Sequence, residues 1–186
     1  MKFTKWILIV FAIVGLLFFF VVGPYMRTQT KKHSPEKTAV YTNNGMDLSV
    51  NYSSPSKKDR IIFGELVPYD VVWRTGANEP TTFSTASDIK IDGKNLSSGV
   101  YSLWTRPGRQ TWSVIFNKNI PDWGVSILSG GKETTRILEE DVIEIEIPTE
   151  QLAETVEHFT IDFDNTGQLY MRIMWDKTLV KVPISK

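Results

Sequence analysis

Residues 143–147 read Ile-Glu-Ile-Glu-Ile, a strict alternation of apolar and acidic side chains. Successive side chains of a β-strand point to opposite faces, so this alternation is typical of a strand with one buried face. The same period recurs in residues 159–163 (FTIDF) and in residues 46–51 (MDLSVN). These stretches predict that most of the chain forms a β-domain.

Turn signals separate the alternating stretches. Asp92-Gly93 is a favoured hairpin dipeptide, and Pro107-Gly108 and Asp176-Lys177 predict two further turns between strands. About nine short strands, with turns every 8–12 residues or so, are typical of a sandwich or barrel. We therefore predict an all-β fold, an antiparallel β-sandwich of about nine short strands, over residues 41–186. Residues 149–157 are predicted to be either a short helix or a connecting loop.

The amino-terminal segment has a different character, because no charged residue lies between Trp6 and Met26. Its 21 residues, at about 1.5 Å each, form a helix of roughly 30 Å, which matches the hydrocarbon core of a bilayer. We predict a membrane anchor over residues 1–26, with its transmembrane part between Trp6 and Val22. Two alternatives remain open. A cleaved signal peptide has a shorter apolar core and a small-residue cleavage site, and a buried helix is rarely apolar on all sides.

Residues 27–40 are polar, contain Pro35 and show no periodicity, so we predict a flexible stalk there. The orientation of the anchor follows from its leading charges, Lys2 and Lys5, which resemble the start of an export signal. The count of positive charges after the anchor does not favour this orientation. We expect a single-pass protein whose globular domain lies on the extracytoplasmic (periplasmic) side.

Composition argues against several partners and chemistries. Lysine plus arginine equals aspartate plus glutamate, at 21 each, so no basic field favours a nucleic-acid partner. The chain has no cysteine, which excludes disulfides, thiolate metal ligands and a cysteine nucleophile. It contains no Gly-x-Ser-x-Gly, no His-Glu-x-x-His and no phosphate-binding glycine loop. We predict no cofactor, no metal ligand and no catalytic residue.

Residues 52–79 read YSSPSKKDRIIFGELVPYDVVWRTGANE, and WRTGANE at residues 73–79 is the most specific part. This stretch, with GVYSL at 99–103 and WSVIFNK at 112–118, resembles an uncharacterised bacterial family, the domain of unknown function numbered 2911, common in Bacteroidetes. The resemblance covers about residues 45–184. The family tends to have glycine where this chain has Asp59 and Asp70. The resemblance implies an exported, all-β domain of unknown activity and brings no catalytic residues with it.

The WRTGANE stretch allows two interpretations. Trp73, Arg74, Asn78 and Glu79 place an aromatic face, a fork of donors and a carboxylate in one loop, which suits the binding of a sugar or another small ligand. Alternatively, Trp73 is part of the core, Arg74 pairs with Glu79 or another acid, and the turn residues adopt positive φ. Trp123 is a second candidate for an exposed aromatic residue. If it lies near Trp73, the two rings form a cleft.

Three functions remain open on the sequence alone. The first is a membrane-anchored cell-envelope domain that binds a ligand, a glycan or a protein partner and performs no catalysis. The second is an envelope hydrolase or lyase that uses the same loop, with Glu79 as general acid or base. The third is a structural accessory domain. His158, the basic residues near Lys57 and the acidic residues at 139–146 are interpreted as solvated surface.

Overall fold

The computed structural model describes residues 2–126 and 128–186, and it divides the chain into two compact units, Met1–His33 and Ser34–Lys186. The first unit is helical. It comprises α1 (Lys2–Leu17), a π-helical turn η1 (Phe18–Val22) and α2 (Gly23–His33). Residues 27–33 are thus helical and β1 begins at Glu36, so the boundaries predicted for a stalk, residues 27–40, differ from the structure.

The helix is long and apolar enough to cross a membrane. The candidate span runs over Lys5–His33, 29 residues, and its most apolar window has a mean hydropathy of 2.9. The large apolar side chains between Trp6 and Met26 are exposed, for example Phe11 at 72% and Phe19 at 73%. By length and composition the segment suits a membrane anchor or a signal sequence.

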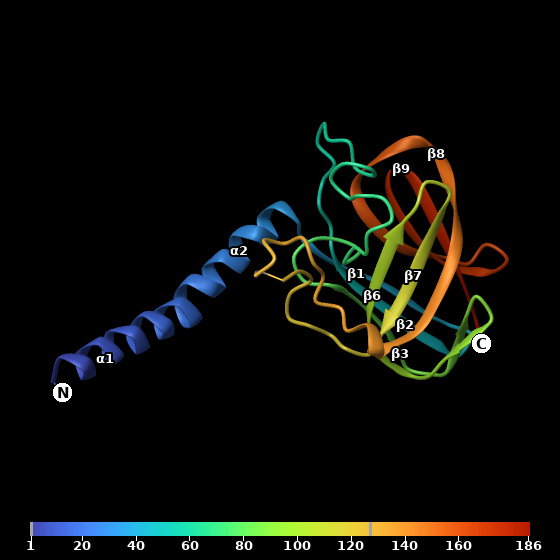
Figure 1. Cartoon of the computed structure of the whole chain (residues 1–186). Helices are drawn as coiled ribbons and strands as arrows, with labels where there is room; N and C mark the ends of the chain where they lie inside the picture. The colour runs from blue at the N-terminus through green and yellow to red at the C-terminus, as the bar shows by residue number, and fades with distance from the viewer. Residues whose placement is uncertain (1, 127) are drawn as a thin grey trace. The chain divides into compact units, whose positions relative to one another are not determined.

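The second unit consists of antiparallel strands (Figure 1). Their bounds are β1 Glu36–Asn43, β2 Met46–Ser53, β3 Thr81–Thr85, β4 Ile89–Ile91, β5 Lys94–Leu96, β6 Gly99–Pro107, β7 Thr111–Asn117, β8 Asp141–Asp164 and β9 Leu169–Ser185. A 3-10 turn, η2 (Leu138–Glu140), precedes β8. The nine strands are hydrogen-bonded in the order β1-β2-β3-β6-β7-β8-β9-β4-β5. The predicted all-β antiparallel fold is confirmed.

Strand β8 pairs with β7 along its first part and with β9 along its second part, and Figure 1 shows it as a long curved ribbon. Residues 141–148 pair with β7, whereas residues 149–164 pair with β9. The distal half faces β1 and β2 across the core, because the rings of Tyr52 and Phe159 lie 5.7 Å apart and those of Tyr41 and Phe163 lie 5.9 Å apart. Ile143, Ile145 and Ile147 are buried, as their alternation predicts.

Two local predictions were wrong, whereas the turns at Asp92-Gly93 and Pro107-Gly108 were right. Residues 149–157 are neither a helix nor a loop, since Thr149 to Gln151 pair with β9 and the strand continues through an irregular register. Asp176-Lys177 is not a hairpin turn. Asp176 has φ 55° inside the continuous strand β9, so it marks an irregularity of the β8–β9 ladder. The Asp92-Gly93 turn is confirmed, with φ 48° and 76°, the signs that a type I′ turn requires.

Candidate functional site

The candidate site is built on the segment that joins β2 to β3, residues 54–80. Ser54 Oγ donates a hydrogen bond to the Phe159 carbonyl at 2.7 Å, and Phe159 N donates to the Pro55 carbonyl at 2.9 Å. Further along, Trp73 and Thr105 exchange two backbone bonds, of 2.6 and 3.0 Å. The segment is therefore held to β8 at one end and to β6 at the other.

Trp73 is part of the hydrophobic core. Its side chain is 9% exposed and its ring stacks on Trp175, with centroids 6.0 Å apart and an interplanar angle of 14°. Phe159 meets it edge-on at 5.2 Å. Its Nε1 donates to the Gly76 carbonyl at 3.0 Å. The Trp73 indole is thus packed among core aromatics and is not an open stacking platform.

The turn after Trp73 is tight and well bonded. Thr75, Gly76 and Asn78 have φ of 55°, 144° and 62°. A β-carbon at Gly76 would lie 2.9 Å from the Ser53 carbonyl oxygen, so only glycine fits there. Thr81 Oγ1 donates to the Thr75 carbonyl at 2.5 Å, which closes the turn against β3.

Arg74 lies between Trp73 and the residues of this turn, and its side chain is half-buried. Gly124 packs against its stem so closely that a β-carbon there would lie 2.4 Å from Arg74 Cδ. Burial lowers the pKa of Arg74, because it penalises the charged guanidinium. A carboxylate at ion-pair distance would act in the opposite direction, so the shift does not support the predicted pairing of Arg74 with an acid.

Two polar atoms of the loop are buried without a partner among the described residues, Arg74 Nε and Asn78 Nδ2. Buried polar groups in proteins are nearly always hydrogen-bonded, so each exception requires an explanation. The Asn78 backbone is satisfied, because its carbonyl accepts a bond from Gly124 N at 3.0 Å.

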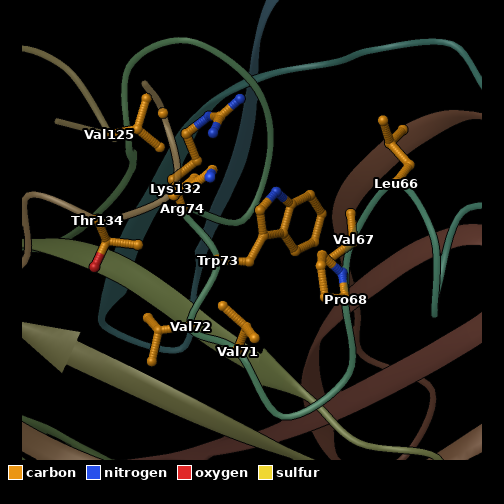
Figure 2. A pocket seen from close by; sticks show the side chains of 11 residues that line it. Leu66, Val67, Pro68, Val71, Val72, Trp73, Arg74, Val125, Lys132 and Thr134 are labelled. Atoms are coloured by element: carbon orange, nitrogen blue, oxygen red, sulfur yellow. The ribbon is translucent and has the colours of Figure 1, made fainter. Parts of the chain in front are cut away.

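A cavity of about 390 Å³ opens beside Trp73 and Arg74 (Figure 2). Figure 2 shows Leu66, Val67 and Pro68 on one side of Trp73, and Arg74 and Lys132 on the other. Its lining residues are Leu66, Val67, Pro68, Val71, Val72, Trp73, Arg74, Val125, Gly131, Lys132 and Thr134. Pockets for small ligands span about 300–1,000 Å³ and are mostly apolar with a few fixed polar groups, and this cavity fits that description.

The family model described as "Protein of unknown function (DUF2911)" matches residues 34–184. The chain belongs to this family. The predicted resemblance is thereby confirmed, and the matched segment begins at Ser34, where the β-unit also begins. No curated protein and no solved structure matches the chain. The family description carries no activity, so inferences about function rest on the geometry of the DUF2911 domain.

The remaining predicted site residues lie around this turn without joining the cavity lining. Glu79 is half-buried and follows the turn. Trp123 is half-buried, and its carbonyl accepts a hydrogen bond from Thr135 Oγ1. The rings that contact Trp73 in the described part of the chain are Phe63, Trp112, Phe159 and Trp175. Trp123 is not among them.

Sequence reasoning missed most of the cavity wall. Leu66, Val71, Gly131 and Lys132 belong to no motif that indicates a binding site. The basic residues near Lys57 serve the loop itself, since Lys57 Nζ lies 3.4 Å from an Asp176 carboxylate oxygen and Arg60 Nε donates to the Lys57 carbonyl at 3.0 Å. His158 is exposed, as its predicted place on a solvated face requires.

Proposed function

We propose that this protein is a membrane-anchored domain of the cell envelope that binds a small ligand and performs no catalysis. The apolar helix would hold the chain in the membrane, with the amino terminus inside and the DUF2911 domain on the extracytoplasmic side. The cavity beside Arg74 would be the binding site. Glycans and protein segments are the other partners that a binding module of this kind would take.

The observation that carries this proposal is Arg74, a residue of the cavity lining whose buried Nε has no hydrogen-bond partner among the described residues. A half-buried guanidinium without a partner costs stability, because burial removes water that nothing in the fold replaces. A folded protein retains such a group where a ligand satisfies it, since functional sites violate the rules that the rest of a structure obeys. Trp73 and the turn at Gly76 would fix the position of this arginine.

A thermal-shift screen tests the proposal. The full-length protein, reconstituted in phosphatidylcholine nanodiscs, would be melted with soluble chito-oligosaccharides, muropeptide fragments, short peptides and short carboxylates. A ligand that binds only the folded state raises the melting temperature by mass action. We expect at least one class to stabilise the wild type.

A cavity-filling variant supplies the control. Val71→Trp places a bulky ring at a lining position that is 47% exposed, so it should abolish the shift. Val40→Trp is the matched change at an exposed valine of β1, outside the cavity lining, and should retain it. Absence of any shift across the panel, or an equal shift in Val71→Trp, would contradict binding at this cavity.

A further inference from the structure

The two sides of the cavity differ in charge. One side carries the apolar residues Leu66, Val67 and Pro68, and the other carries the cations Arg74 and Lys132. No aspartate or glutamate is among the described residues that line it. The chain as a whole has no net charge, so the positive character of this wall is local.

We propose that the cavity binds a small organic anion, a carboxylate attached to a short apolar body. This inference rests on the proposed function and names the class of its ligand. The carboxylate would accept hydrogen bonds from the Arg74 guanidinium and the Lys132 ammonium group, and the apolar body would lie along Leu66 and Val67. Thr134 is a further lining residue of the cavity.

The structure favours an anion over a neutral sugar. Sugar sites use an exposed aromatic face as a platform, but Trp73 is only 9% exposed and its ring stacks on Trp175. The unsatisfied group at the cavity is a cation, and a guanidinium binds carboxylates through paired N–H donors. Partial burial strengthens that attraction, because the effective dielectric constant is lower than in water.

The test compares three probes of one length: hexanoate, hexanamide and hexylammonium. Each would be titrated calorimetrically into the full-length protein in phosphatidylcholine nanodiscs, with empty nanodiscs as the blank. A hydrogen bond to a charged group contributes about 1.5–3 kcal/mol, which corresponds to roughly tenfold or more in affinity. We expect hexanoate to bind at least about tenfold more tightly than hexanamide, and hexylammonium to bind more weakly than either.

Three variants test whether the preference for hexanoate over hexanamide arises in the cavity. Arg74→Gln should lower the hexanoate affinity about tenfold or more and leave the hexanamide affinity nearly unchanged. Lys132→Gln, at an exposed position, should lower the hexanoate affinity by a smaller factor. Lys118→Gln removes an exposed lysine outside the cavity lining and should have no effect.

The possible results separate this proposal from the one on which it rests. Equal affinities for hexanoate and hexanamide, both lost in Val71→Trp, would overturn the anionic class and leave ligand binding at the cavity intact. A hexanoate preference that persists in both Arg74→Gln and Lys132→Gln would also overturn it. If none of the three probes binds, the anionic class is again overturned, and the broader thermal-shift panel decides separately whether the cavity binds anything.

Discussion

Trp73 and Arg74 are neighbours in the chain but lie in different environments. The indole is one of a group of core rings, and its N–H is bonded to the Gly76 carbonyl. The guanidinium borders a cavity and keeps an unpaired Nε. The WRTGANE sequence alone left the structural and ligand-binding interpretations open for the whole loop, and the structure places Trp73 in the core. The ligand-binding interpretation stays a proposal, and it concerns Arg74.

Replacing Trp73 tests the structural half of this division. Trp73→Phe removes the indole N–H, leaves the buried Gly76 carbonyl unsatisfied and opens a void among the core rings. We expect a loss of about 2–4 kcal/mol in the free energy of unfolding, measured by urea denaturation of the full-length protein. Trp123→Phe is the matched control at a half-buried tryptophan and should cost less than about 1 kcal/mol. Equal losses in the two variants would contradict the assignment of Trp73 to the core.

The tightness of the turn at Gly76 can be tested by comparing the stability lost on Gly76→Ala with that lost on Gly93→Ala, since both glycines have positive φ. Gly93→Ala, in a hairpin with open space around the position, adds only backbone strain of about 1–2 kcal/mol. Gly76→Ala adds strain and a contact of 2.9 Å with the Ser53 carbonyl, so it should cost about 1–3 kcal/mol more than Gly93→Ala in the same denaturation experiment. A smaller effect at Gly76 than at Gly93 would show that the turn is not as tight as described.

At the scale of elements, period-2 alternation predicted the strands correctly and their ends less well. IEIEI and FTIDF lie in β8, with their apolar positions at 143, 145, 147, 159 and 161 all buried. The sequence between them lacks alternation and therefore did not predict a strand, and there β8 pairs with β9 only through Val156, between two shifts of register. Asp176 was predicted as a turn because aspartate favours positive φ in hairpin turns, but a single such residue also fits within a strand.

Asp164, at the turn between β8 and β9, should make the stability of the fold depend on pH. The pKa of Asp164 lies below its ordinary value, chiefly because the Thr166 hydroxyl and then the Thr166 backbone N–H donate to its carboxylate. A pKa that is lower in the folded state means that the ionised group stabilises the fold above the unfolded pKa of about 3.9. That contribution is lost as the pH falls through the folded pKa.

We therefore expect the melting temperature of the wild type to exceed that of Asp164→Asn at pH 6, and the difference to shrink as the pH is lowered from about 4. Thr166→Ala removes the principal donor and should show the same pattern with a smaller difference at pH 6. A difference that stays constant from pH 6 to pH 2.5 would contradict this role of the Asp164 carboxylate.

At the scale of the whole molecule, composition and periodicity predicted an apolar amino-terminal helix and an antiparallel β-domain, and both are present. The cavity was not predicted. Its wall combines residues 66–74 with residues 125–134, and only packing brings these distant segments together. Neither segment has a periodic pattern, so no sequence signal indicated that they would share a surface.

The anchor gives a prediction at this scale. An uncleaved helix should keep the full chain of 21.2 kDa in the membrane fraction after an alkaline carbonate wash, as measured by intact mass spectrometry. Deletion of residues 1–33 removes the helical unit and should release the β-unit into the soluble fraction. A shorter mature mass would instead indicate a cleaved signal peptide, and release of the intact chain by carbonate would contradict anchoring altogether.

The most direct measurement is the free energy of unfolding of Arg74→Met in the full-length protein without ligand. Methionine retains much of the stem that packs against Gly124 and removes the buried, unpaired Nε. If Arg74 serves a ligand, the variant should be as stable as the wild type or more stable by up to about 1–2 kcal/mol, because an unsatisfied buried group has been removed. A loss of more than about 2 kcal/mol would show that Arg74 holds the loop to the fold, and it would contradict a ligand-binding role for this cavity.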